Sequence, residues 1–212
     1  MRLKVCGMKY QDNITDVVAL EPEYLGFIFY ERSPRNFVGD LAQFSGSYKK
    51  VGVFVDASAA KIIDICSSAN LDLIQLHGDE TPGYCYDLRD ALESQNSDYH
   101  IELIKAFAVD ESFDFRGLKA YEDVVDYFLF DTKGKLPGGN GIAFDWNLIA
   151  DYNMKKPFFL SGGIGLESVE DLKAFMASEL SAYCHAIDIN SRFEDKPGLK
   201  NIKKLNLFKK EL

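Results

Sequence analysis

The stretch PFFLSGGIGLESVEDLKAFMA, residues 157–177, joins a short apolar run to an amphipathic segment through a glycine-rich turn. The apolar run predicts a buried strand, and the polar–apolar spacing of residues 166–177 predicts a helix. A strand that leads through a short turn into a helix is typical of βαβ units, which build parallel sheets with right-handed connections. The stretch therefore predicts an α/β protein.

The same alternation recurs along the whole chain of 212 residues. Eight apolar runs predict strands: LKVCG, YLGFIF, KVGVFV, LIQLHG, IELIKAFAV, YFLFD, PFFLSGG and AIDINS. Helices are expected over 11–20, 38–45, 58–69, 80–94, 111–122, 145–151, 166–177 and 199–210. Eight consecutive units favour a closed barrel over an open sheet, and the chain has neither GxGxxG after its first strand nor a P-loop. We expect residues 1–212 to form a single-domain (β/α)8 TIM barrel.

Composition narrows the class of protein. With 24 basic and 33 acidic residues the net charge is -9, which argues against nucleic acid or an anionic membrane as a partner. The start, MRLKVCG, lacks a signal-peptide pattern, and no apolar run approaches the roughly 18 residues of a membrane span, so we expect a cytoplasmic protein. The four cysteines lie far apart without metal-ligand spacing, so neither a metal site nor a disulfide is expected.

Residues at the strand ends are the candidates for an active site, because the βα loops of such a barrel meet over its C-terminal face. Cysteine is often a packed core residue, and Cys6 alone would suit that role. Its position at the end of the first strand makes it a site candidate instead. His77, Asp131, the turn 161–163 and the pair Asn190–Ser191 also end strands.

Several polar side chains are expected to point into the barrel, because outward faces must meet apolar helices. Counting in steps of two places two side chains of each of four strands on the inner face: Lys4 and Cys6, Gln75 and His77, Leu129 and Asp131, and Asp188 and Asn190. Buried charges persist only when they are paired and hydrogen-bonded. A structural ion pair between Lys4 and Asp188 and a role for Asp188 in binding substrate are both open at this point.

Glycines indicate a bound phosphate. Gly162 and Gly163 follow the seventh strand, and Asn190 and Ser191 follow the eighth, where barrels of this kind commonly hold a phosphate. Glycine lets the backbone approach a ligand, and amides at a helix N-terminus attract anions. A second glycine-rich stretch, KGKLPGGNGIAFDW at 133–146, suits either a loop that closes over substrate or a plain surface loop, with Asp145 capping the helix that follows.

An ordered set of motifs runs the length of the chain: KVCGMK, GFIFYERSPRNF, VGVFV, IQLHGDE, LFDTKG with PGGNGIAFDW, LSGGI, and DINSRFE with PGLK. Together they resemble the phosphoribosylanthranilate isomerase family of tryptophan biosynthesis. The resemblance implies an Amadori rearrangement of N-(5-phosphoribosyl)anthranilate to 1-(2-carboxyphenylamino)-1-deoxyribulose 5-phosphate. It also implies acid/base catalysis without cofactor or metal, on a small phosphosugar.

The resemblance also implies residue roles. Cys6 becomes the general base, Asp131 the general acid, and Arg35 the cation that grips the anthranilate carboxylate. Lys4 is expected to help ionise the Cys6 thiol. His77 is not needed by this chemistry and is expected to be structural or supporting.

One position departs from the family. The family most often has serine–glycine where this chain has Ser191–Arg192. Either Arg192 binds the phosphate by charge or it points to solvent.

Two other functions remain to be weighed. An indole-glycerol-phosphate synthase needs lysines and glutamates at strand ends, and this chain offers Lys105 within the fifth strand but no matching set. A non-catalytic barrel that senses a phosphosugar would keep the glycine turns and have no use for Cys6 and Asp131. Both a monomer and a homodimer fit the sequence.

Overall fold

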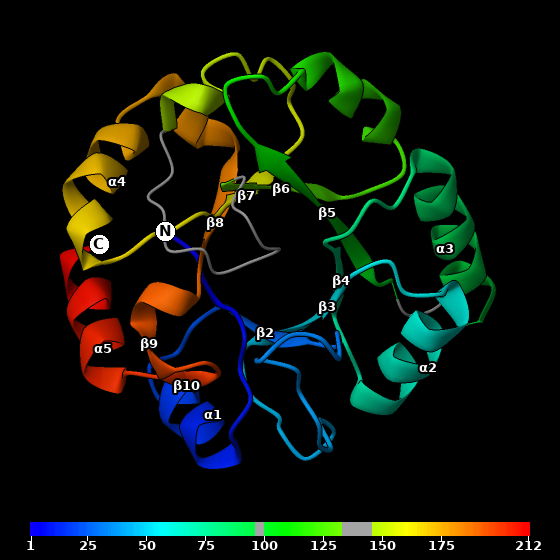
Figure 1. The fold of residues 1–212 in the computed structure, drawn as a ribbon, viewed down its shortest axis with the longest axis horizontal. Coiled ribbons are helices and arrows are strands. Elements are labelled where there is room, and N and C mark those ends of the chain that lie inside the picture. The colour runs from blue at the N-terminus through cyan, green and yellow to red at the C-terminus, as the bar shows by residue number, and fades with distance from the viewer. Residues whose placement is uncertain (96–99, 133–145) are drawn as a thin grey trace.

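Eight parallel strands close into a barrel in the computed structural model, which describes residues 1–95, 100–132 and 146–212. Each strand pairs with its neighbour in chain order, and the first pairs with the last (Figure 1). The strands are β1 Leu3–Val5, β2 Tyr24–Ile28, β3 Lys49–Phe54, β4 Leu73–Leu76, β5 Glu102–Val109, β6 Tyr127–Thr132, β7 Phe158–Leu160 and β8 Cys184–Ile189. The expected barrel is confirmed.

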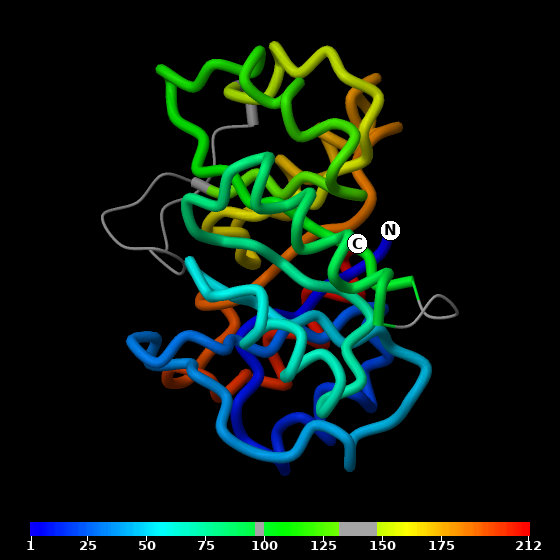
Figure 2. Tube along the Cα trace, turned by 90° about the vertical axis from the view of Figure 1, so that its right-hand side faces the viewer, coloured from blue at the N-terminus to red at the C-terminus, as the bar shows by residue number. Residues whose placement is uncertain are grey.

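Helices surround the barrel and cover the outer face of its strands (Figure 1). In the described part of the chain they are α1 Gln11–Val18, α2 Ala59–Ala69, α3 Pro82–Gln95, α4 Val169–Met176 and α5 Ile202–Glu211. The apolar side chains of helices and strands form one continuous buried cluster between the two layers. Both termini lie on the same side of the molecule (Figure 2).

The helix expected over 38–45 is wrong, since these residues form turns and bends. The Asp40 side chain accepts a hydrogen bond from the Ala42 amide at 2.8 Å, which offers the backbone a local alternative to helical bonding. Phe37 and Leu41 are buried and hold the loop against the barrel. A loop with two apolar anchors therefore takes the place of the second outer helix.

Other expected helices are shorter than the sequence pattern indicated. Within 111–122 the chain forms only the 3₁₀ helix η1, Phe115–Tyr121, and within 145–151 it forms η2, Trp146–Ile149. Asp114 accepts from the Arg116 amide at 3.0 Å, so the first of these begins at a side-chain cap.

The two C-terminal helices also start later than expected. After β7, the 3₁₀ helix η3, Leu166–Ser168, precedes α4. The last expected helix begins after a small hairpin, β9 Glu194–Lys196 with β10 Leu199–Lys200, and Asn201 caps α5.

The barrel interior is layered from apolar to polar. Toward the N-terminal ends of the strands, the interior is a separate buried cluster with side chains from β2 to β8: Tyr24, Val51, Leu73, Ile104, Ala106, Leu129, Phe159 and Ala186. On β4, β6 and β8 the next side chain on the inner face, two residues further along, is polar. Gln75 follows Leu73, Asp131 follows Leu129, and Asp188 follows Ala186. The polar layer lies directly beneath the C-terminal face.

His185 closes the opposite end of the barrel. Its Nδ1 lies 3.3 Å from Arg2 Nη1 and its Nε2 lies 2.6 Å from the Tyr24 hydroxyl. Because arginine only donates, Nδ1 accepts and the Nε2–H donates to Tyr24. Burial, reinforced by the charge of Arg2, lowers the pKa of His185 from 6.5 to about 4.

His185 should make stability depend on pH. Between pH 6.5 and about 4 the unfolded chain binds a proton at this histidine and the folded chain does not, so stability is lost as pH falls. We expect urea denaturation to show a shallower fall in the free energy of unfolding over this range for His185→Gln than for wild type. His100→Gln, at a side chain 59% exposed, is the matched control and should keep the wild-type slope. Equal slopes in all three proteins would contradict the assignment.

Candidate active site

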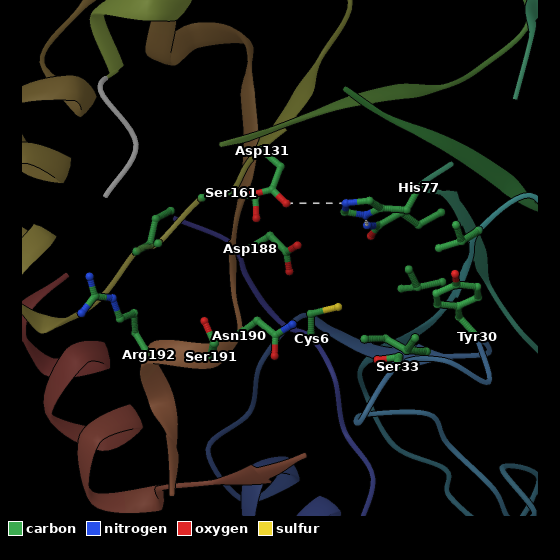
Figure 3. A pocket seen from close by; sticks show the side chains of 17 residues that line it. Cys6, Tyr30, Ser33, His77, Asp131, Ser161, Asp188, Asn190, Ser191 and Arg192 are labelled. Atoms are coloured by element: carbon green, nitrogen blue, oxygen red, sulfur yellow. Dashed lines mark hydrogen bonds and ion pairs between the residues drawn. The ribbon is translucent and has the colours of Figure 1, made fainter. Parts of the chain in front are cut away.

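A cavity of about 700 Å³, measured out to its open mouth, lies over the C-terminal ends of the strands. It brings together most of the residues expected at the site (Figure 3): Cys6, Asp131, Gly162, Gly163, Asp188, Asn190 and Ser191. Arg35 is not among the residues that line it.

Cys6 directly follows β1, and its amide donates to the Ile189 carbonyl at 2.9 Å. Gly7 follows with φ 76°, and a Cβ there would lie 2.7 Å from Asn190 Oδ1. Gly26 faces the thiol, since a Cβ on it would lie 2.7 Å from Cys6 Sγ. Gly26 thus leaves room for the thiol, which is 4% exposed, and Gly7 leaves room for Asn190 beside it.

Lys4 lies fully buried beneath the cavity. Its ammonium donates to Asp188 Oδ1 at 3.0 Å and to Gln75 Oε1 at 2.7 Å. Burial would lower the pKa of Lys4, but the charges of Asp188 and Cys6 raise it above its ordinary value. Of the two alternatives left open by the sequence, the structure shows the ion pair of Lys4 and Asp188, and the ammonium stays charged inside the barrel.

Lys4 acts on the Cys6 thiol in the expected direction, but burial outweighs it. Burial raises the pKa of the Cys6 thiol, and the nearby Lys4 ammonium offsets this only in part. Asp188 adds a further rise, whereas the more distant Lys200 lowers the pKa. The thiol is therefore ionised in a minority of molecules near neutral pH, but it is a stronger base once ionised.

His77 faces Asp131 across the cavity, and this contact was missed from the sequence. His77 Nε2 lies 3.5 Å from Asp131 Oδ2, and Nδ1 lies 2.8 Å from the Gln75 amide nitrogen (Figure 3). The available signal was the strand count, which puts Gln75 and His77 on one face of β4. His77 therefore belongs to the site as a neighbour of the expected acid.

Arg35 forms an ion pair that the sequence did not reveal. Its Nε and Nη2 donate to the Glu194 carboxylate at 3.0 and 2.7 Å, and Lys200 Nζ donates to the same carboxylate at 2.7 Å. Burial would raise the pKa of Glu194, but hydrogen bonds from Arg35 and Lys200 lower it. Lys200 also donates to Asn190 Oδ1 at 2.7 Å, so this cluster is joined to the cavity wall.

The glycine turn after β7 lines one side of the cavity. Gly162 and Gly163 have φ of 99° and 60°, a conformation that favours glycine. Arg192 lies at the same rim, with its guanidinium 3.4 Å from Glu167 Oε1. The residues after β8 form the short 3₁₀ helix η5, Ser191–Phe193, which precedes the hairpin that leads to α5.

Some expectations lie outside the described residues, namely the loop of 133–145 with Lys133 and Lys135, and the cap Asp145. In the ranges that the structure describes, no group of three His, Cys, Asp or Glu side chains could hold a metal ion. Within the same ranges no helix is long and apolar enough to cross a bilayer.

Comparison with known proteins identifies the family. The profile of N-(5'-phosphoribosyl)anthranilate (PRA) isomerase matches residues 3–211. The chain belongs to the PRA isomerase family. An N-(5'-phosphoribosyl)anthranilate isomerase of Parabacteroides distasonis is 43% identical over 98% of this chain and 91% of the relative. Another, from Rhodospirillum centenum, is 37% identical over 95% and 92%.

Solved PRA isomerase structures share the fold. The Thermus thermophilus enzyme superposes with a TM-score of 0.80 at 25% identity, covering 100% of this chain and 98% of the other. A second enzyme was solved in complex with reduced 1-(o-carboxyphenylamino)-1-deoxyribulose 5-phosphate, with a TM-score of 0.74, 26% identity and coverage of 100% and 97%. A structure of monomers generated from the dimeric Thermotoga maritima enzyme gives a TM-score of 0.75 at 26% identity, covering 100% of this chain and 97% of the other.

The charges around Cys6 predict opposite shifts in its reactivity. We expect Asp188→Asn to move the pH midpoint of Cys6 alkylation by iodoacetamide downward, because a cause of the raised thiol pKa is removed. Lys200→Met should move the midpoint upward, because a cation that lowers the pKa is lost. Mass spectrometry of the Cys6 peptide measures the rate. Shifts of the same sign, or none, would contradict this account of the thiol.

Proposed function

We propose that this chain catalyses the isomerisation of N-(5'-phosphoribosyl)anthranilate to 1-(2-carboxyphenylamino)-1-deoxyribulose 5-phosphate, with Cys6 as base and Asp131 as acid. The observation that supports the assignment of roles is that a thiol after β1 and a carboxyl group on β6 line the same cavity. Membership of the PRA isomerase family supports the reaction itself.

The first step opens the ribose ring. Asp131 gives a proton to the ring oxygen, the bond between C1 and this oxygen breaks, and the lone pair of the anthranilate nitrogen forms a C1=N bond. The product is a protonated Schiff base with a free hydroxyl group at C4. A positioned acid of this kind contributes roughly 10²–10⁴-fold to rate.

The second step moves hydrogen from C2. The positive Schiff base acidifies the C2 proton, the Cys6 thiolate removes it, and the electron pair forms a C1=C2 bond as the C1=N pair returns to nitrogen. The resulting enolamine becomes the aminoketose when the C2 hydroxyl loses its proton and C1 gains one. A base with a raised pKa suits removal of a proton from carbon, and Lys4 stabilises the thiolate it needs.

The two ends of the substrate are anionic and need separate sites. We assign the phosphate to the turn of Gly162 and Gly163 together with Asn190 and Ser191, where backbone can approach closely. Arg192 brings a cation to this rim and takes the place of the glycine that the family most often carries.

The anthranilate carboxylate is assigned to Arg35. Its pair with Glu194 occupies the Nε and Nη2 edge of the guanidinium and leaves Nη1 on the other edge to bind it.

Loss of either reacting group should remove activity and keep the fold. We expect Cys6→Ala and Asp131→Asn each to lower kcat by roughly 10²–10⁴-fold, measured by the fall in substrate fluorescence. Cys66→Ala is the matched control, because Cys66 is buried within α2 away from the cavity and should keep wild-type kcat. A Cys6→Ala enzyme with more than about a tenth of the wild-type rate would show that Cys6 is only a packed thiol.

Arg35 should act on binding more than on chemistry. The carboxylate keeps its charge throughout the reaction, so its contact stabilises ground state and transition state alike. We expect Arg35→Ala to raise KM and lower kcat/KM by roughly 30- to 1000-fold, the range of a charge-assisted contact of about 2–4 kcal/mol. Arg32→Ala, at an exposed arginine of the same loop, is the matched control. A fall in kcat at unchanged KM would place the carboxylate elsewhere.

The assembly state follows from neither the cavity nor the fold. We retain monomer and homodimer as the two alternatives, with the dimeric Thermotoga maritima relative in support of the second. Light scattering on the purified protein distinguishes them.

A further inference from the structure

We propose that Lys4, acting through Gln75, fixes His77 as the neutral tautomer with its proton on Nε2, directed at Asp131. Lys4, Gln75 and His77 would then be positioning residues for the acid. The catalytic part of this inference rests on the proposed function, in which Asp131 is the acid. The tautomer itself follows from the contacts alone.

Lys4 determines which atoms donate and which accept in the contacts from Lys4 to Gln75 and His77. An ammonium group has three donors and no acceptor, so the atom that faces it must accept. The Gln75 atom 2.7 Å from Lys4 Nζ is therefore its carbonyl oxygen Oε1. The salt bridge between Lys4 and Asp188, 0% and 6% exposed, keeps this ammonium in place.

The orientation of Gln75 then sets the histidine. With Oε1 on Lys4, the amide NH₂ points at His77 Nδ1, 2.8 Å away. This nitrogen must accept, so the proton of the neutral ring is on Nε2. Nε2 lies 3.5 Å from Asp131 Oδ2, a gap that a small movement of either side chain closes to a hydrogen bond.

The backbone of His77 is held from both sides. Its amide donates to the Phe54 carbonyl at 2.8 Å, and the next residue, Gly78, donates its amide to Glu80 Oε2 at 3.0 Å. Lys105 Nζ donates to the Gly78 carbonyl at 2.7 Å and pairs with Glu80 at 3.2 Å. The backbone from which the ring projects is therefore fixed, and the bond from Gln75 orients the ring itself.

This tautomer has a consequence for the acid. The Nε2–H offers Asp131 a donor and no lone pair, so His77 cannot draw the proton from the acid before the substrate does. After Asp131 has given its proton to the ring oxygen, the same N–H stabilises the carboxylate that remains. The other tautomer would present a lone pair to Asp131 and have the opposite effect.

Nuclear magnetic resonance can read the tautomer directly. The chain has 3 histidines, and long-range ¹⁵N–¹H correlation on ¹⁵N-histidine-labelled protein distinguishes the ring states, with single substitutions for assignment. At neutral pH we expect His77 to be a single species with the proton on Nε2. His185, whose Nδ1 accepts from Arg2, is the internal reference for that tautomer. The exposed His100 is the reference for a ring that exchanges between tautomers. A proton on Nδ1 of His77, or a doubly protonated ring, would overturn the proposal.

A double-mutant cycle tests whether Gln75 acts through His77. Gln75→Met keeps the side-chain length and removes both polar contacts. We expect it to lower kcat and kcat/KM equally, by about 10- to 100-fold, the range of one hydrogen bond to a charged group. In a His77→Ala background the same change should cause almost no further loss. Additive losses would overturn the positioning role, because Gln75 would then act on its own.

A packing control separates this effect from general damage. Ile104 is the register neighbour of Gln75 on β5 and belongs to the apolar layer, so Ile104→Val should reduce stability slightly and keep kcat. The outcomes also separate the two proposals. Absence of turnover in the wild-type protein overturns the proposed function while the NMR result stands. Turnover together with the wrong tautomer overturns the positioning inference alone.

Discussion

The Lys4 ammonium lies at the centre of the barrel, where a charge is tolerated only if its partners replace the water it has lost. Asp188 and Gln75 supply these contacts from β8 and β4. Breaking a buried pair of this kind commonly costs about 3–5 kcal/mol, because the remaining charge has no partner. The polar layer is thus a constraint on the whole barrel, since β1, β4 and β8 must keep the register that brings these three side chains together.

The rest of the interior is arranged around that constraint. Below Lys4, apolar side chains fill the barrel and supply the burial that stabilises it. Above it, the same strands end in the groups that face the cavity. Strand periodicity alone places the apolar, polar and site-lining side chains in successive layers, because positions two apart share the inner face. The apolar side chains that stabilise the fold and the side chains that face the cavity therefore lie in successive layers of the same barrel.

The sequence predicted the barrel because each strand repeats the same apolar pattern. It predicted that Lys4 and Asp188 point into the barrel because period-two counting sets the face, and it left their ion pair as one of two alternatives. It did not predict the loop over 38–45, where the Asp40 turn competes with a helical pattern. It also missed the bond between Arg35 and Glu194, since no local pattern links residues 159 positions apart. The raised pKa of Cys6 was missed because the cost of burial depends on what surrounds the thiol.

A single cation touches both halves of the proposed chemistry. The charge of Lys4 lowers the pKa of Cys6, and its contact with Gln75 leads to His77, the neighbour of Asp131. A positive charge at this point favours the thiolate form of the base, and because it can only donate, it also orders the amide and the imidazole next to the acid. Arginine would keep the charge and methionine the length, but neither reproduces a compact group with three donors in this space. The identity of residue 4 is thereby tied to the base, the acid and the register of the barrel at once.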